Sequence, residues 1–292
     1  MQEKIKNAKK DQVIEKQEDP LKLFVASQSV VDFHEKASNF AFFVNHFIFE
    51  NIDKNNRYPV ASGALLSLSC DALSIHQSIR SLCEAGWAFS CSILLRSLMD
   101  CLLNVGVICS RKNEAEYMGF KYTHYFLKTA LSDRSNSEEL RNIYLKQKQE
   151  GLDKLNQHNR QKAEEFFRGK QQGYWYNPEY KNPSEILKKF TSSDIQYLYN
   201  VYSGSAHGGF SGLKMLRDNP NDIHPHPRAD ERSQNLAILT STRFLIEIFT
   251  LRGNLEVGGI DILYKKIISE FIELANPFFL NSKIMLLKES KR

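Results

Sequence analysis

The feature that most constrains the fold of this chain is the distribution of its prolines. The 292 residues include eight prolines, and the 118 consecutive residues from Val60 to Asn177 contain none. Proline interrupts a helix because it lacks the backbone N–H and clashes with the preceding turn. Folds made of strands and turns place prolines more regularly along the chain. A proline-free stretch of this length therefore favours a fold built from long helices.

Apolar residues recur at three- and four-residue steps over most of the chain, which is the spacing of one helix face. Six segments carry this pattern most clearly: 21–51, 60–84, 86–110, 113–131, 229–252 and 260–274. No alternating run typical of a strand and no repeat of solenoid length is present. We predict an all-α fold, a single bundle of about seven to nine helices over residues 21–280. A polar tail or helix at 1–20 precedes it, and a basic tail at 281–292 follows it.

Residues 137–170 form a long polar segment with only a sparse apolar stripe. We predict one long polar helix or a projecting arm here, which begins at Ser137 because serine caps helix starts well. From Arg111 to Lys170 the chain has 13 Lys and Arg against 9 Asp and Glu, so most of the net charge of +5 lies there. This excess is typical of a solvated helix face, and it also suits a surface for a nucleic acid or a partner protein.

The cysteines and the overall charge exclude several classes of protein. A net charge of +5 is too small for a general nucleic-acid binder unless the charge is concentrated. All five cysteines lie between residues 70 and 109, and no pair has C-x-x-C spacing. We therefore expect reduced, mostly buried thiols and no zinc knuckle or redox motif.

The sequence also lacks the marks of a secreted or membrane protein. The first 20 residues mix acidic and basic side chains and contain no apolar core of a signal peptide. The one candidate membrane segment, 87–109, has Arg96 and Asp100 at its centre, and each charge would cost about 2.5–3.5 kcal/mol there. We therefore expect a cytoplasmic protein that does not enter a membrane.

The first candidate site is this charged pair within an apolar helix. Arg96 and Asp100 are four residues apart, so both side chains lie on one helix face. Two interpretations stay open. The pair is an internal salt bridge that sets the register of the helix, or it is a guanidinium held by a carboxylate and presented to an anion such as phosphate.

The second candidate site is the segment YLYNVYSGSAHGGFSG at 197–212. Tyr199, Tyr202 and His207 come near the end of a predicted helix that opens into glycines. The helix dipole favours a charged histidine at this end, which would tune His207 as an acid, and the glycines permit close approach of a ligand. His207 is equally suited to capping the helix, with Gly208 as the left-handed stop.

Two short motifs resemble those of an uncharacterised bacterial family. R-S-L-x-[D/E], at Arg96 to Asp100, is followed about 100 residues later by Y-S-x-x-x-H-G, at Tyr202 to Gly208, and the stretch S-I-R-S-L-C-E-A-G-W-A at 78–88 is similar as well. The family is an all-helical domain of unknown function with members associated with phage defence and abortive infection. The resemblance covers roughly residues 60–250. The family usually has Glu where this chain has Asp100.

This family is in turn similar to the helical HEPN class (higher eukaryotes and prokaryotes nucleotide-binding). Many HEPN proteins are metal-independent ribonucleases with an R-x(4–6)-H motif. Arg217 and His224 have this spacing, and Asp218 follows the arginine directly. Pro220 lies where the motif normally begins a helix, so the resemblance implies Arg217 and His224 only as secondary candidates.

Other chemistries find less support in the sequence. His224 and His226, with His207, would offer three imidazoles to zinc, but HPHP is equally typical of a stiff loop. Motifs of P-loop, dinucleotide-binding, serine-hydrolase and zincin sites are absent. We therefore expect no metal and no cofactor.

These residues support two functional hypotheses. In the first, the chain is an anti-phage defence or toxin-type effector, a HEPN-like metal-independent ribonuclease. Arg96, held by Asp100, binds phosphate, and His207 is the general acid or base with Tyr202 nearby. In the second, the same cluster belongs to a non-catalytic module that recognises a nucleotide, a small anion or a partner protein encoded alongside. Self-association of the chain is compatible with both hypotheses. A third hypothesis is that the cluster is purely structural.

Overall fold

The computed structural model describes residues 26–52, 58–133, 135–169, 174–176, 179–190, 196, 198–200, 203, 231–257, 262–263, 265–267, 269–270 and 273. Of these residues 87% are helical, and none of them forms a strand. The all-α prediction is confirmed. The expected tails at 1–20 and 281–292 lie outside the described residues.

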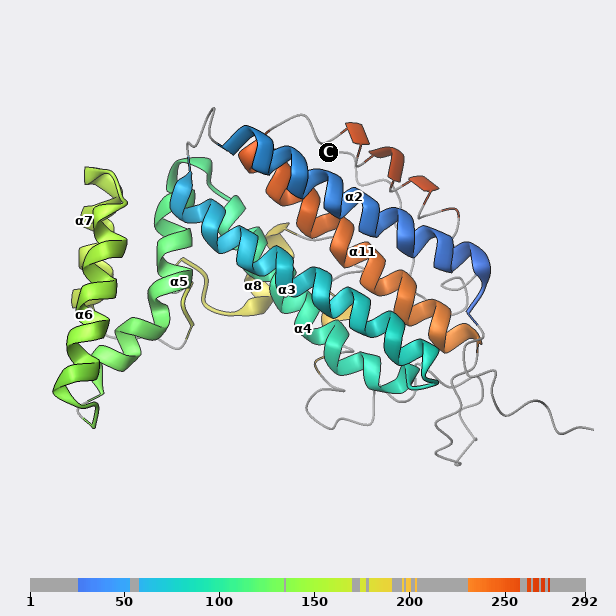
Figure 1. The fold of residues 1–292 in the computed structure, drawn as a ribbon, viewed down its shortest axis with the longest axis horizontal. Coiled ribbons are helices and arrows are strands. Elements are labelled where there is room, and N and C mark those ends of the chain that lie inside the picture. Colours follow the sequence, from blue (N-terminus) through green and yellow to red (C-terminus); the bar gives the residue numbers. More distant parts are fainter. Residues whose placement is uncertain are drawn as a thin grey trace, which may run out of the picture.

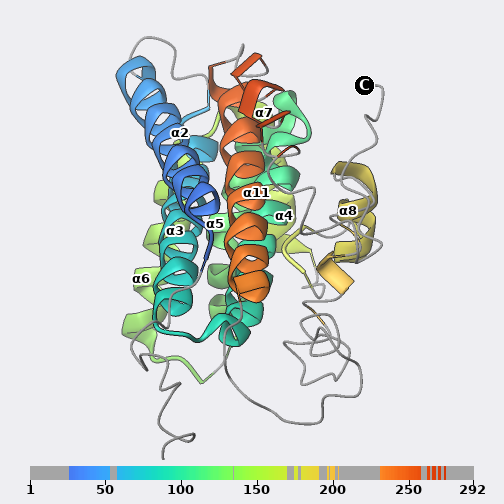
Figure 2. The same cartoon turned by 90° about the vertical axis from the view of Figure 1, so that its right-hand side faces the viewer.

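The described part of the chain contains eight α-helices. They are α2 (Gln28–Ile52), α3 (Pro59–Glu84), α4 (Cys91–Cys109), α5 (Ala115–Ser132), α6 (Glu138–Asp153), α7 (Gln157–Arg168), α8 (Pro183–Phe190) and α11 (Glu231–Glu256). The 3-10 turns Ala88–Ser90 and Lys112–Glu114 lead into α4 and α5. Helices α2, α3 and α4 pack around α11, and α5 extends from this bundle toward α6 and α7 (Figures 1 and 2).

Helix α11 is the centre of the bundle and is buried on almost every side. Its apolar residues, such as Phe244 and Phe249, are fully buried, and so are polar ones such as Gln234. A helix buried all round must be surrounded by other helices, because a surface helix keeps one polar face in water. A neighbouring segment supplies a partner to one of its polar side chains: Asn235 Oδ1 accepts a hydrogen bond of 2.9 Å from the backbone N–H of Ser27.

Helix α3 begins at a proline, and a carboxylate from α5 completes its N-terminus. Pro59 suits the first turn because its missing N–H would be unpaired there anyway. The buried carboxylate of Glu116 accepts the backbone N–H groups of Val60 at 3.1 Å and Ala61 at 3.2 Å. This contact joins α3 to α5 and places negative charge at the positive end of the α3 dipole.

The polar segment 137–170 is a helical hairpin, not the one long helix that the sequence pattern indicates. Helix α6 starts at Ser137, whose Oγ accepts the N–H of Leu140 at 3.3 Å, as predicted. The chain then turns, and α7 starts at Asn156, whose Oδ1 accepts the N–H of Asn159 at 3.0 Å. An asparagine that caps a new helix is a weak sequence signal, and the glycine nearest to the break, Gly151, still lies within the last turn of α6.

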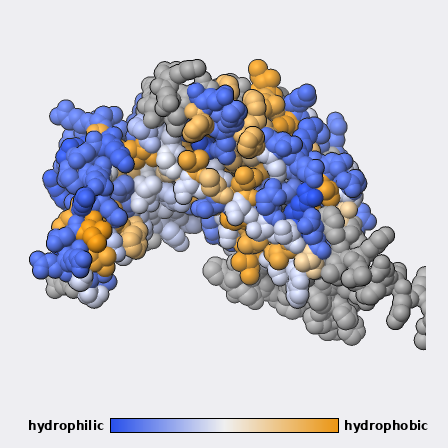
Figure 3. Space-filling model, viewed as in Figure 1, coloured by the Kyte–Doolittle hydropathy of each residue, from blue (hydrophilic) through white to orange (hydrophobic). Residues whose placement is uncertain are grey.

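The α6–α7 hairpin packs on α5 around a small second core made of Phe120, Leu152, Leu155 and Ala163. Its surface is mostly hydrophilic in the view of Figure 3, and the hairpin projects from one end of the molecule in Figure 1. The arm that the sequence predicted is therefore present, in a folded-back form.

Helix α4 is the apolar helix that the sequence singled out as a membrane candidate. It is the one helix among the described residues that is long and apolar enough to cross a membrane, and 61% of its apolar window is buried in the protein. Of the five thiols that were expected to be mostly buried, those of Cys83, Cys91 and Cys101 are buried. Cys70 is exposed, and Cys109 is half-buried. The expectation of a buried thiol is wrong for Cys70, because this residue lies on the solvent side of α3.

Two histidines stack in the core between α2, α3 and α11. The rings of His34 and His76 are 3.9 Å apart and nearly parallel, and both side chains are buried. His76 Nδ1 lies 3.0 Å from Ser241 Oγ, which donates its own hydrogen to the carbonyl of Ile238. Burial lowers the pKa of His34 to about 4, and it lowers the pKa of His76 as well. Both rings are therefore neutral in the folded protein at pH 7.

The close approach of α5 to α3 gives a matched pair of stability tests. A Cβ on Gly119 would lie 2.6 Å from the Cα of Ala61, whereas a Cβ on Gly63 would meet nothing within 4 Å. We expect Gly119→Ala to lower the free energy of unfolding by about 1–3 kcal/mol, since the helices must separate. We expect Gly63→Ala to raise it by about 0.5–1 kcal/mol through helix propensity. Urea unfolding of both variants checks this, and equal effects would contradict the tight α3–α5 contact.

The histidine pair makes stability depend on pH. The unfolded chain binds a proton on His34 below the ordinary pKa of 6.5, whereas the folded protein does so only near 4. The free energy of unfolding should therefore fall as the pH falls through this window. Arg80, Glu35 and Glu84 are the charged groups that act on the pair. Urea unfolding at several pH values measures the slope, and His34→Leu should flatten it. An unchanged slope in that variant would refute the assignment.

Candidate functional site

One face of the apolar helix α4 carries a polar stripe of three residues at four-residue steps: Arg96, Asp100 and Asn104. Arg96 Nη1 donates to Asp100 Oδ1. The Arg96 side chain is 17% exposed, but the Asp100 side chain is 49% exposed. The pair therefore lies at the edge of the core, with Arg96 mostly buried and Asp100 half exposed. The carboxylate reaches the solvent because the stripe faces away from α11.

Arg96 is also held from the opposite side by a tyrosine that is distant in sequence. Its Nη2 donates a 2.8 Å hydrogen bond to the Tyr199 hydroxyl, and its Cζ lies 4.3 Å from the centroid of the Tyr199 ring. Burial raises the pKa of Tyr199, although the positive charge of Arg96 opposes the rise. The tyrosine is therefore neutral at pH 7, and the guanidinium is fixed between a carboxylate and an aromatic face.

An aromatic loop covers the remainder of the stripe. Trp175 donates its indole N–H to Asn104 Oδ1 at 2.9 Å and packs edge-on against Tyr122 of α5. Tyr174 and Tyr176 stack with their rings 5.1 Å apart, and Tyr176 is buried while Tyr174 is about half exposed. Burial raises the pKa of Tyr176, and the neighbouring tyrosines and Asp100 raise it further. The site is thus a charged pair bordered by aromatic rings.

The described residues contain only part of the site that the sequence predicted. Arg96 and Asp100 form the expected pair. Tyr202 and His207, like the secondary candidates Arg217 and His224, lie outside the described residues. Tyr199, which belongs to the same candidate segment, is described and contacts Arg96.

Two residues of the site were not found from the sequence: Asn104 and Trp175. Asn104 continues the Arg96–Asp100 spacing by one more turn and could have been found from it. Trp175 gave no such signal, because its place at α4 is set by how the chain returns to the bundle. Tyr199 belongs to the second candidate segment, but its hydrogen bond with Arg96 was not predicted. Within the described ranges, no group of three or more His, Cys, Asp or Glu side chains is placed to hold a metal ion.

Comparison with known proteins assigns the chain to a family. Residues 63–224 match the model of a family described as "Family of unknown function (DUF5677)", and this range is more than half of the chain. The chain belongs to the DUF5677 family. No curated protein and no solved structure matches it.

The DUF5677 match begins within α3 and extends past Tyr199, so the polar stripe of α4 and its tyrosine belong to the family domain. Helix α11, which is the centre of the bundle, lies outside the matched range. The expected uncharacterised family is thus confirmed, and the finer associations with phage defence and with HEPN proteins stay predictions.

The bond between Tyr199 and Arg96 can be tested by removing one oxygen atom. Tyr199→Phe keeps the ring but removes the hydroxyl that accepts from Arg96 Nη2, and we expect a loss of about 1–2 kcal/mol in the free energy of unfolding. Tyr174→Phe is the control, because Tyr174 is about half exposed, and we expect it to change stability by no more than about 0.5 kcal/mol. Urea denaturation measures both. Equal effects of the two substitutions would contradict a specific Arg96–Tyr199 bond.

Proposed function

We propose that this DUF5677 protein is a cytoplasmic defence or toxin-type effector that cleaves RNA without a metal ion, as HEPN-like ribonucleases do. The observation that supports this most directly is the contact of Arg96 with Tyr199. It brings the R-S-L-x-D helix together with the chain segment that runs into Tyr202 and His207. In this proposal α4 supplies the cation for the phosphate, and the segment that follows Tyr199 in the chain supplies the proton-transfer group.

Arg96 is suited to hold a phosphate during this reaction. A guanidinium has five N–H donors, and its bonds to Asp100 and Tyr199 use one from each of two nitrogens. Asp100 and the Tyr199 ring keep the group in one orientation, which a transition state requires of a positioning cation. Metal-independent cleavage proceeds by attack of the ribose 2′-hydroxyl on phosphorus as the bond to the 5′-oxygen breaks.

His207 supplies the proton transfer in this proposal. It takes the proton of the 2′-hydroxyl or gives one to the leaving 5′-oxygen, and Tyr202 lines the wall nearby. Arg217 and His224 are the secondary pair for the same role. The half-exposed ring of Tyr174 offers a surface on which a base can stack, and the basic excess between Arg111 and Lys170 offers positive charge to the phosphates.

The second candidate is a module that binds a nucleotide, a small anion or a partner protein and does not cleave. One observation favours it: the two buried tyrosines beside the Arg96–Asp100 pair are poor proton-transfer groups near pH 7. Burial raises the pKa of both Tyr199 and Tyr176, so neither exchanges protons readily there. The two candidates differ in whether His207 is needed for cleavage or only for binding.

The test is an RNA-cleavage assay of His207→Ala with a chelator present throughout. We expect the wild-type protein to cleave RNA in the chelator and the variant to lose cleavage by about 100-fold or more, since removal of a general acid–base group costs about this much. Toxicity on expression in cells should disappear in parallel.

Tyr174→Phe serves as the control for the same assay, because it changes a tyrosine of the site while the proton-transfer group is kept. Circular dichroism verifies that each variant is folded. Cleavage by His207→Ala at the wild-type rate would remove the nuclease proposal. Absence of cleavage by the wild type, with binding of RNA or a nucleotide retained, would favour the binding module.

A further inference from the structure

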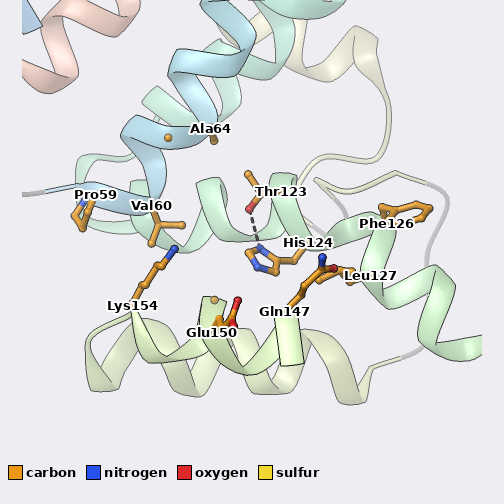
Figure 4. A pocket seen from close by; sticks show the side chains of 12 residues that line it. Pro59, Val60, Ala64, Thr123, His124, Phe126, Leu127, Gln147, Glu150 and Lys154 are labelled. Atoms are coloured by element: carbon orange, nitrogen blue, oxygen red, sulfur yellow. Dashed lines mark hydrogen bonds between the residues drawn. The ribbon is translucent and has the colours of Figure 1, made fainter. Parts of the chain in front are cut away.

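A cavity lies away from the α4 site, at the junction of the bundle and the α6–α7 hairpin. It has a volume of about 470 Å³ and is lined by residues of three helices. We call it the α3–α5–α6 cavity; its main lining residues are Pro59, Val60, His124, Leu127, Glu150 and Lys154. Small-molecule sites typically have volumes of roughly 300–1,000 Å³. Figure 4 shows side chains of all three helices converging on this space.

The hydrogen bonds of His124 define which ring nitrogen is available in the cavity. Its Nδ1 lies 3.1 Å from the carbonyl oxygen of Phe120 and 2.7 Å from Thr123 Oγ1. Thr123 Oγ1 lies 3.0 Å from the carbonyl oxygen of Gly119, to which it donates its own hydrogen. Nδ1 therefore carries the ring hydrogen, and Nε2 is left as an acceptor. Burial lowers the pKa of His124, and the nearby charge of Lys154 lowers it too, so the ring is neutral at pH 7.

Glycine at position 151 lets the His124 ring pack directly against α6. A Cβ atom on Gly151 would collide with His124 Nε2 and would meet the Phe120 ring at 3.0 Å. Any other residue at this point of α6 would therefore displace the ring from the cavity wall. The cavity is thus lined by a histidine held in one position and one tautomer, with Nε2 as its acceptor.

Opposite charges stand on the wall formed by α6. Glu150 and Lys154 are one helical turn apart, and both line the cavity. In Figure 4 Glu150 lies near the His124 ring, and the ammonium of Lys154 lies beside Val60 at the start of α3. Glu150 and His124 Nε2 therefore form an acceptor side, Lys154 forms a cationic side, and Val60, Ala64 and Leu127 supply apolar wall.

We propose that the α3–α5–α6 cavity binds a small zwitterionic ligand, a free amino acid with an apolar side chain. The ligand ammonium donates to Glu150 and to His124 Nε2, and the ligand carboxylate pairs with Lys154. The side chain packs on the apolar wall. A nucleotide fits this arrangement less well, because a phosphate close to Glu150 would be repelled.

Isothermal titration calorimetry of the full chain with L-leucine tests the proposal. L-leucinol lacks the carboxylate, and N-acetyl-L-leucine lacks the ammonium. We expect L-leucine to bind and each analogue to bind at least about tenfold more weakly, since each loses a charge-assisted contact. L-phenylalanine and AMP are titrated in parallel to compare a larger apolar side chain and a nucleotide.

Two variants assign each end of the ligand. Lys154→Gln should weaken the binding of L-leucine by about tenfold and leave the binding of L-leucinol unchanged, because only the ligand carboxylate contacts Lys154. Glu150→Gln should weaken the binding of L-leucine and leave the binding of N-acetyl-L-leucine unchanged, because only the ligand ammonium contacts Glu150. Lys148→Gln is the matched control: it removes a positive charge from the same helix at a side chain that covers the Phe167 ring. Circular dichroism confirms that the three variants fold.

Three results would overturn the proposal: no heat with L-leucine or L-phenylalanine at about 10 mM ligand, equal binding of L-leucinol, or unchanged L-leucine affinity in Lys154→Gln. Binding of AMP alone would reassign the cavity to nucleotides. These outcomes do not bear on RNA cleavage, because the cavity shares none of its lining residues with the α4 site.

Discussion

The burial of α11 on nearly all of its faces is the constraint on which the rest of the structure depends. A 26-residue helix with so little exposed surface must be enclosed, and α2, α3 and α4 do so. The enclosure includes charged groups: Arg252 pairs with Glu256 at 2.6 Å and also contacts Asn45 of α2, and Arg243 pairs with Glu247 at 2.6 Å. Such pairs add little net stability in themselves, but loss of one partner would leave a buried charge uncompensated. They therefore favour one arrangement of the helices around α11.

The same constraint explains why the candidate site is on α4. One side of this helix packs on α11 and α3 and has to be apolar, so the polar stripe of Arg96, Asp100 and Asn104 is confined to the other side. There it is bordered by Trp175 and Tyr199, which come from segments that return to the bundle. A guanidinium between a carboxylate and an aromatic ring is well fixed, and the cost of ordering it is met during folding rather than on ligand binding. This is the property that both the nuclease and the binding-module hypotheses require.

The α6–α7 hairpin packs on α5 around a second, smaller hydrophobic core. Because α5 carries Phe120 in the small core and His124 beside the cavity, packing of the hairpin on α5 also builds the α3–α5–α6 cavity. Glu116 ties α5 to the start of α3 one turn before Phe120, so the three helices that line the cavity are fixed relative to one another. The DUF5677 match includes all three helices almost completely, which places the cavity and the α4 stripe in one family domain.

The sequence by itself determined the helical class, the positions of most helices, the Ser137 cap and the Arg96–Asp100 pair. These are local properties: proline content, apolar spacing, capping chemistry and i,i+4 geometry act within a few residues and can be read without a partner. Only the tertiary structure decided that residues 137–170 fold back on themselves at Asn156, that Cys70 and Asp100 face the solvent, and that Tyr199 and Trp175 reach α4. Each of these depends on which face of a helix meets another segment. That choice is made by packing between residues up to about a hundred positions apart, for which a single sequence carries no periodic signal.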